Sequence, residues 1–531
     1  MRGLADRGEE HGVSSRTAEK KTAIKNSLGR LTFAIIAITA QVVWLVYLLK
    51  RISEFFPWMS WVITGVSIIL ALGLYGRKIN AEIKMPWIML ILVFPVVGII
   101  LYLLIGLNGT TRKMRRRFRA IDEKLYPLMP QDGKVLRRLE EKSLYAANMS
   151  RYILLHRSQP VYQNTDVVFH NETLKALEDL KRELARAEKF IFMEYFAVED
   201  AEAFHEISRI LREKAAAGVD VRLFYDDVGS IGFVNRTFIR KMDAAGIRCR
   251  VFNPMTPVLN FFMNNRDHRK ITVIDGKVAF TGGYNLADEY FNIIHPYGYW
   301  KDSGVMLRGE AVRSLTMIFL EMWNAVRDDN LNDEEFHHFL AEAPCSGEGT
   351  AFVQPYAESP IYPGHVAEDV YLNILGSAER YAYFFTPYLI ITDEMTRAFA
   401  LAARRGVDVR IITPGIPDKK LIYRVTRSYY GQLVDNGVRI FEYSPGFCHA
   451  KQCVVDGKTA AVGTINLDYR SLYHHFENGV LVHDCAFAER VREDFEDSFR
   501  KSTEVTENYR RDRKRRFRLV DLLLRLIAPA L

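Results

Sequence analysis

The sequence predicts an α/β fold in which two tandem halves form one pseudo-two-fold unit, preceded by an all-α transmembrane region. Three observations predict it: long uncharged apolar stretches before residue 107, a sequence repeat between residues 160 and 500, and a polar motif that occurs once in each repeat. A chain of 531 residues is also too long for one ordinary core, so two or three domains are expected.

The N-terminal region begins with a polar, basic tail, residues 1–30. It continues with three stretches that carry no charged residue, at 31–49, 55–75 and 85–106. A helix needs about 20 apolar residues to cross the hydrocarbon core of a membrane, and uncharged runs of this length are rare in soluble cores. We therefore expect three transmembrane helices and a multi-pass protein of the cell membrane.

Basic residues flank these stretches and bear on their orientation. The segment 107–159 is expected to be a basic juxtamembrane linker, and its run Arg112–Arg119 suits anionic lipid headgroups. With three spans, each side of the membrane receives eight flanking lysines and arginines, so the positive-inside rule does not choose an orientation. Five cysteines without paired spacing are typical of free thiols in a reducing compartment.

The net charge of +8 and the pI near 9.0 suit nucleic acid, an anionic membrane or a phosphorylated substrate. The densest basic runs lie beside the apolar stretches and at Arg510–Arg518, within a basic and amphipathic C-terminal segment, residues 501–531. This distribution favours the membrane and anionic lipid as partners, and not nucleic acid.

A repeat organises the remaining chain. The sequence Gly-Val-Asp-Val-Arg occurs at 218–222 and again at 406–410, each time after a helical stretch and at the start of a short apolar strand. Strands alternate with helices in both copies, which predicts a sheet covered by helices in a first half, 160–345, and a second half, 346–500. A repeat of this size is typical of a fused dimer, so one copy of a motif from each half can build a single site.

The motif has the form His-x-Lys-x4-Asp and is followed, 17 residues after its histidine, by an asparagine. The two copies are His268, Lys270, Asp275 and Asn285, and His449, Lys451, Asp456 and Asn466. Residues two apart in a strand point to the same side, so each histidine and lysine should share a face. Two solvated hairpins closed by Asp-Gly turns would explain the aspartates, but not the repeated histidine and lysine.

These residue types suit phosphodiester exchange, which needs a nucleophile, a proton donor for the leaving alkoxide and positive charge on the phosphoryl oxygens. One neutral histidine would attack phosphorus and become a phosphohistidine, and the other would act as acid and then base. The two lysines and the two asparagines would hold the phosphoryl oxygens, so no metal and no cofactor is expected. The pair His474-His475 is the nearest ligand candidate, but adjacent residues of a strand point in opposite directions.

A nucleophilic histidine also needs an acceptor on its other ring nitrogen. We expect Asp302, 34 residues after His268, and Glu477, 28 residues after His449, to be these orienting carboxylates. The motif residues Asp275 and Asp456 are expected to have a structural role, closing the loop below the site.

On these motifs, residues 160–500 resemble the phospholipase D superfamily, and most closely its bacterial cardiolipin synthases. The similar segments include 225–230, 281–290, 386–388, 412–419 and 462–471 with the following Phe-Glu-Asn. The resemblance implies transfer of a phosphatidyl group from one phosphatidylglycerol to another with release of glycerol, by a catalytic domain on the cytoplasmic face. Residues 1–54 look additional to the usual two-span anchor of that family.

Other functions use the same residues. A membrane-bound phospholipase D would pass the phosphatidyl group to water and form phosphatidic acid, and a nuclease of the superfamily would act on nucleic acid. A membrane scaffold without activity is disfavoured because both motif copies are intact. The sequence leaves open which histidine attacks, the donor and acyl-chain preference, and the oligomeric state.

Overall fold

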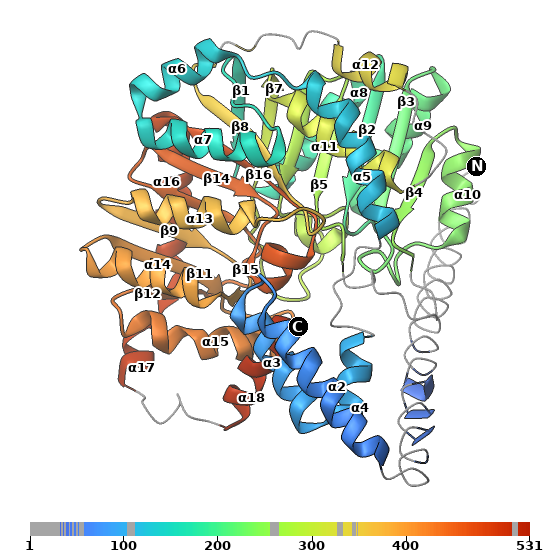
Figure 1. Cartoon of the computed structure of the whole chain (residues 1–531). Coiled ribbons are helices and arrows are strands. Elements are labelled where there is room, and N and C mark those ends of the chain that lie inside the picture. The colour runs from blue at the N-terminus through green and yellow to red at the C-terminus, as the bar shows by residue number, and fades with distance from the viewer. Residues whose placement is uncertain are drawn as a thin grey trace, which may run out of the picture.

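The computed structural model (Figure 1) describes residues 58–103, 112–254, 265–326, 333–341, 347, 349–511 and 519–530, with scattered residues between 32 and 51. The predicted tail 1–30 and most of the predicted span 31–49 lie outside the described residues. Two α/β halves pack side by side, and three helices of the N-terminal region lie together beneath them in Figure 1.

The first half contains a seven-stranded sheet with the order β4-β3-β2-β5-β6-β7-β1. Its strands are β1 (Thr165–His170), β2 (Phe190–Tyr195), β3 (Asp220–Asp226), β4 (Arg248–Phe252), β5 (Lys270–Ile274), β6 (Val278–Gly282) and β7 (Gly304–Gly309). Its helices are α8 (Thr173–Ala185), α9 (Glu202–Ala216), α10 (Arg236–Ala244), α11 (Val312–Ala325) and α12 (Asp333–Ala341).

The second half contains an eight-stranded sheet with the order β17-β12-β11-β9-β13-β14-β16-β8. Its strands are β8 (Phe352–Glu358), β9 (Tyr381–Phe385), β11 (Asp408–Pro414), β12 (Arg439–Tyr443), β13 (Gln452–Val455), β14 (Thr459–Gly463), β16 (Glu477–His483) and β17 (Ser502–Glu504). Its helices are α13 (Val366–Ser377), α14 (Asp393–Arg404), α15 (Lys420–Val434) and α16 (Cys485–Arg500), and a two-strand ladder joins β10 (Leu389–Ile390) to β15 (Leu467–Asp468).

The two sheets repeat one topology, since β12-β11-β9-β13-β14-β16-β8 corresponds strand by strand to β4-β3-β2-β5-β6-β7-β1, and β17 adds one edge strand. In both halves three parallel strands are followed by an antiparallel hairpin that carries the motif. The tandem α/β halves predicted from the repeat are therefore confirmed.

The core between the halves is apolar. Helix α11 of the first half and α16 of the second each touch both sheets, and one buried cluster includes Ile271, Phe319 and Phe495. Separate clusters join the outer face of the first sheet to α8–α10 and the outer face of the second to α13–α15. The order of layers is outer helices, first sheet, α11 and α16, second sheet and outer helices. This order buries both faces of each sheet and holds the two motif hairpins in a fixed relation.

Two single parallel bridges join the halves where the motifs begin. Asp267 is bridged to Phe476, and Lys301 to Cys448. In each case the residue before a motif histidine pairs with the residue before an acidic residue of the other half. The backbone N–H of His268 donates to the Phe476 carbonyl at 2.9 Å, and the N–H of His449 to the Lys301 carbonyl at 2.7 Å.

Among the described residues, one helix is long and apolar enough to cross a membrane, α2 (Trp58–Tyr75). It coincides with the second predicted span. The third predicted span, 85–106, is not one helix: α3 (Ala81–Val93) ends at Phe94, and a short α4 (Pro95–Leu101) follows. Thirteen residues of α3 extend about 20 Å, which is less than the hydrocarbon thickness.

Helices α3 and α4 fold back on each other. A Cβ on Gly98 would lie 2.5 Å from the Leu90 carbonyl oxygen, and the rings of Trp87 and Tyr102 are 5.6 Å apart. Residues 15 apart would be separated by about 22 Å in a continuous helix. The segment is therefore a helical hairpin, because Phe94 leaves the helical conformation (ψ 72°) and Pro95 starts a new helix.

The range 107–159, expected to be a linker, forms helices where it is described: α5 (Arg112–Leu125), α6 (Gly133–Lys142) and α7 (Leu144–Arg157). The basic run lies on α5, whose Phe118 is buried and stacks on Phe476 at 5.6 Å. At the C-terminal end, α17 (Thr506–Arg511) precedes α18 (Leu519–Ile527), which packs on α15 and α3 through Leu524 and leaves Leu522 and Leu523 exposed.

Candidate active site

The two motif histidines are buried at the junction of the halves, and each is bonded to a carboxylate from the opposite half. The Nδ1 atom of His268 lies 2.9 and 3.0 Å from the two carboxylate oxygens of Glu477. The Nδ1 atom of His449 lies 2.7 Å from Oδ2 of Asp302. Because each carboxylate accepts from Nδ1–H, the Nε2 atom of each ring keeps its lone pair for chemistry.

This pairing differs from the one that residue counting suggests. Counting within a half places Asp302 after His268 and Glu477 after His449, whereas the structure exchanges the two carboxylates between the halves. The bridges explain the exchange: they align Asp267 with Phe476 and Lys301 with Cys448, so the next residue on each strand faces its counterpart across the junction. Neither half on its own supplies both members of the His268–Glu477 pair or of the His449–Asp302 pair.

Glu477 is held by more than His268. The hydroxyl of Ser471 donates to its Oε1 at 2.7 Å, and the hydroxyl of Thr464 donates to its Oε2. In the other half Gly283 occupies the place of Thr464, and a Cβ there would lie 2.0 Å from Oδ1 of Asp302. The glycine therefore leaves the space that the shorter aspartate needs, which explains why the two repeats differ at this position.

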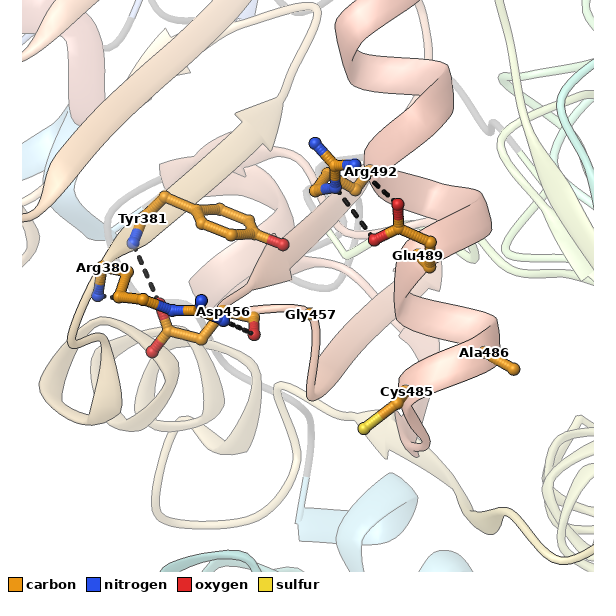
Figure 2. Close-up of a pocket in the computed structure, with 8 residues that line it drawn as sticks. All are labelled: Arg380, Tyr381, Asp456, Gly457, Cys485, Ala486, Glu489 and Arg492. Carbon is orange, nitrogen blue, oxygen red and sulfur yellow. Dashed lines mark hydrogen bonds and ion pairs between the residues drawn. The ribbon is translucent and has the colours of Figure 1, made fainter.

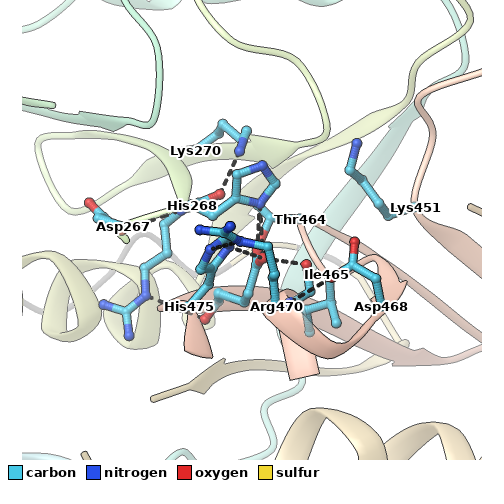
Figure 3. Close-up of polar contacts among 12 residues, drawn as sticks. Asp267, His268, Lys270, Lys451, Thr464, Ile465, Asp468, Arg470 and His475 are labelled. Atoms are coloured by element: carbon cyan, nitrogen blue, oxygen red, sulfur yellow. Dashed lines mark hydrogen bonds and ion pairs between the residues drawn. The ribbon is translucent and has the colours of Figure 1, made fainter. Parts of the chain in front are cut away.

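The two lysines reach the site from opposite halves (Figure 3). Lys270 Nζ donates to the His268 carbonyl at 2.5 Å, and Lys451 Nζ donates to the His449 carbonyl. Both side chains are almost completely buried. Burial disfavours the charged form and lowers the lysine pKa to about 7 for Lys270 and about 8 for Lys451, although nearby carboxylates oppose the shift.

The surroundings also hold the histidines in the neutral form. Burial first, and then the positive charges of Lys270 and Lys451, lower the pKa of His268 and of His449 well below the usual value. Burial raises the pKa of Asp302 to about 6, against the opposing charge of Lys451. Two buried lysines beside the histidines favour an anionic phosphodiester, whose charge would offset that of the lysines.

The two histidines have different neighbours. The ring of His449 is packed among Tyr290, Trp300 and Phe447, at centroid distances of 5.2 to 5.8 Å. The ring of His268 has Phe196 at 5.0 Å and His475 at 5.7 Å. One side of the site is therefore aromatic, and the other contains a further imidazole.

The side-chain oxygens of the two motif asparagines differ in whether the fold already uses them. Asn285 Oδ1 accepts from the Ala197 N–H at 3.0 Å, which ties the loop after β6 to the end of β2. Asn466 lies beside Asp468, whose carboxylate it bonds, and its Oδ1 atom is buried without a hydrogen-bond partner among the described residues. Asn466 therefore has the freer acceptor, while the side-chain oxygen of Asn285 is already used by the fold.

The motif aspartates lie at the far ends of β5 and β13 from the histidines. Asp275 accepts from three consecutive backbone N–H groups, those of Glu188, Lys189 and Phe190. Asp456 accepts in the same way from Glu379, Arg380 and Tyr381. These contacts fix the start of β2 and of β9, as expected of residues that close a loop.

Asp456 also borders a surface pocket, with Arg380, Cys485, Glu489 and Arg492 (Figure 2). This pocket is remote from the two motif histidines. Its arginines are already engaged, since Arg492 pairs with Glu489 and Arg380 donates to the Asp456 carbonyl. We do not assign it to the site.

Sequence reasoning missed the contacts of Arg470, Ser471 and His475. The alternation expected of a strand does not apply to His474-His475, because residues Arg470–His474 form one turn of π-helix, η5. His475 Nδ1 lies 3.8 Å from Glu477 Oε1, and His475 Nε2 accepts from Arg470 Nε at 3.1 Å. His268, His475 and Glu477 could geometrically surround a cation, but two lysines and Arg470 beside them oppose one.

The fold and site define a class: duplicated α/β proteins in which a histidine from each half meets at the junction. Residues 180–323 and 371–499 match the family model described as cardiolipin synthase, phospholipase-D-like domain, and residues 61–106 match the phospholipase D-nuclease N-terminal model. This chain belongs to the phospholipase-D-like cardiolipin synthase family.

Individual relatives agree over most of the chain. A Streptococcus mutans protein of uncharacterised function is 40% identical over 462 residues, which cover 87% of this chain and 99% of that one. A cardiolipin synthase of Halalkalibacterium halodurans is 30% identical over 521 residues, 96% of this chain and 100% of the relative. The crystal structure of phosphatidylserine synthase from Haemophilus influenzae aligns with a TM-score of 0.54 at 14% identity, over 72% of this chain and 99% of that one, and supports the fold.

The contacts of the motif aspartates predict the effect of removing one. Asp456→Ala would leave three partly buried backbone N–H groups without their charged acceptor, and should lower the free energy of unfolding by about 2 kcal/mol. Thermal unfolding in detergent measures the loss, and Asp456→Asn, which keeps one acceptor oxygen, should lose less. The folded fraction should keep its turnover number. A variant of normal stability without activity would instead place Asp456 in the chemistry.

Proposed function

We propose that this chain is a cardiolipin synthase that transfers a phosphatidyl group from one phosphatidylglycerol to another through a phosphohistidine. The observation that carries the proposal is the pairing of each motif histidine with a carboxylate of the opposite half, His268 with Glu477 and His449 with Asp302. The buried junction where they meet also contains Lys270 and Lys451. The family to which the chain belongs supports the same activity.

In the first step the neutral Nε2 of one histidine attacks phosphorus, and an N–P bond forms while the P–O bond to the headgroup glycerol breaks. The second histidine, protonated, gives its proton to the departing glycerol oxygen. In the second step that histidine takes the proton of a hydroxyl on another phosphatidylglycerol, whose oxygen attacks phosphorus and displaces the first histidine. Two phosphatidylglycerols give cardiolipin and glycerol, and atoms and charge balance.

One of the two histidines must become protonated to act as the proton donor, in a site that favours the neutral form of both rings. An incoming phosphodiester brings one negative charge next to Lys270 and Lys451, and this offsets the lysine charges that lower the histidine pKa values. Substrate binding itself would then allow one imidazole to take up a proton. Glu477 and Asp302 stabilise whichever imidazolium forms, and the lysines with Asn466 hold the non-bridging oxygens.

Product analysis tests the function. Purified protein in phosphatidylglycerol vesicles should release glycerol and form cardiolipin in equal amounts. His268→Ala and His449→Ala should each lower the rate by at least about a thousandfold, because each half supplies only one of the two histidines.

The rate should be unchanged in EDTA, since the lysines supply the stabilising charge. Phosphatidic acid as the main product would show that the protein is a phospholipase D. The absence of any product would favour a membrane scaffold without activity. Activity near half in either histidine variant would contradict a shared site.

The pH dependence follows from the buried groups. Asp302 must be ionised to support His449, so kcat/KM should fall as the pH drops below its raised pKa of about 6. The lysines must be charged, so it should fall again as the pH rises through their lowered pKa values of about 7 and about 8. A short-chain phosphatidylglycerol avoids surface-charge effects. Asp302→Asn should lose the acidic limb, and a flat profile across these values in the unaltered protein would contradict the assignment.

We also propose a topology in which the N-terminus and the catalytic unit lie in the cytoplasm. The α3–α4 hairpin enters the membrane and returns to the same side, so only the spans 31–49 and α2 cross. The six basic residues of the run 112–119 then join the eight on the side of the N-terminus, which makes fourteen against two at Lys50 and Arg51. For three spans the basic residues on the two sides are equal in number, whereas for two spans the positive-inside rule favours this orientation.

Cysteine labelling of intact cells tests the topology. Cys485 is exposed on the catalytic unit, and Cys249, Cys448 and Cys453 are buried. With Cys345 replaced by serine, a membrane-impermeant maleimide should label Lys50→Cys in intact cells, but Lys78→Cys and Cys485 only after lysis. Labelling of Lys78→Cys and Cys485 from opposite sides would show that 85–106 crosses the membrane after all.

A further inference from the structure

A single turn of π-helix, η5 (Arg470–His474), lies between the membrane anchor, helices α2–α4, and Glu477, the carboxylate that is bonded to His268. On one side Ser471 donates to Glu477 at 2.7 Å, and the chain runs directly from the turn through His475 into β16, which begins with Glu477. On the other side the Tyr473 hydroxyl donates to the buried carboxylate of Glu368. The same short segment therefore contacts both the site and the opposite side of the second half.

The Tyr473 hydroxyl also contacts the membrane anchor, at the residue before α3. Asn80, the residue before α3, donates from Nδ2 to the Tyr473 oxygen at 3.4 Å and to Glu394 Oε2 at 3.0 Å. Its Oδ1 caps α3 by accepting from the Glu82 N–H at 2.8 Å. Ile83, on the first turn of α3, is buried in the cluster that contains Tyr473, so the start of α3 is part of the core of the second half.

Tyr473 has little freedom to move. Its ring lies 4.1 Å from the ring of His365, and its partner Glu368 is fixed by Thr392, whose hydroxyl donates at 2.6 Å. A π-turn is an uncommon backbone arrangement that persists only where its surroundings hold it. Here the surroundings are Tyr473 at one end and the Ser471–Glu477 and Arg470–His475 hydrogen bonds at the other.

We propose that Tyr473 is a positioning residue for the Glu477–His268 pair, and that Asn80 of the membrane anchor holds Tyr473 in place. The inference rests on the phosphotransfer site proposed above. It gives the anchor a second role: besides keeping the enzyme at the membrane, α3 fixes the turn that aims Glu477 at His268. Partners of this kind, which orient a reacting group through another residue, typically contribute ten- to a hundredfold to activity.

A double-mutant cycle tests the connection. Tyr473→Phe removes the hydroxyl that both Asn80 and Glu368 contact. Asn80→Ser keeps a helix cap of similar strength, adds no charge and removes the amide that reaches Tyr473. Glu394→Gln is the matched control, because its amide oxygen still accepts from Asn80, and it should behave as the unaltered protein. Turnover is measured on short-chain phosphatidylglycerol in detergent micelles, where membrane attachment is not limiting.

Each single variant should lower kcat about tenfold with KM unchanged, and the double variant should lose no more than Tyr473→Phe alone. Losses that multiply to about a hundredfold would show that Asn80 acts independently of Tyr473 and would overturn the inference. So would an unchanged kcat in Asn80→Ser, or a rise in KM alone.

Hydrogen exchange gives a readout that does not depend on the reaction. Amides of residues 470–477 should exchange faster in Asn80→Ser and in Tyr473→Phe, but not in Glu394→Gln. If the unaltered protein makes no cardiolipin, the proposed function fails while faster exchange still supports the link. Unchanged exchange in both variants would refute the link whatever the reaction proves to be.

Discussion

The architecture of the site depends on two backbone bridges, Asp267 with Phe476 and Lys301 with Cys448. Each is a single parallel contact, and each places a histidine beside a carboxylate of the opposite half. Because the bridges are related by the internal repeat, the fold makes the same arrangement twice at one junction. Helices α11 and α16 each pack on both sheets, so apolar packing between the halves supports the bridges.

Burial changes the pKa values of the residues that these bridges bring together. Burial first, and then the charges of Lys270 and Lys451, lower the pKa of both histidines and favour their neutral form. The two sides are not identical. Gly283 and Thr464 fit carboxylates of different length. Three aromatic rings surround His449, whereas Phe196 and His475 lie beside His268. These differences make the surroundings of the two histidines chemically distinct.

The membrane region is attached to this unit and is not a separate tether. The α3–α4 hairpin starts in the core of the second half, α18 packs against it, and α5 inserts Phe118 against the bridge residue Phe476. A lipid phosphate lies at the headgroup plane, so an enzyme acting on it gains from a fixed relation between anchor and site. Asn80 and Tyr473 connect the two directly.

The sequence by itself determined the repeat, the motif and the presence of apolar segments, because each follows from local periodicity or from residues repeated at equal spacing. Asp302 and Glu477 stand at unequal spacings, 34 and 28 residues after the motif histidines, so the sequence indicated them only as candidates. It also indicated the structural role of Asp275 and Asp456, since an Asp-Gly turn is a local signal. Only the tertiary structure decided which carboxylate serves which histidine, because each pair joins residues far apart in the chain, 209 positions for His268 and Glu477 and 147 for His449 and Asp302. The sequence also could not predict the chain reversal at Phe94 or the π-turn at Arg470–His474. The hydropathy of 85–106 is the same for a span and for a hairpin, and the residues that hold the π-turn are distant in the sequence.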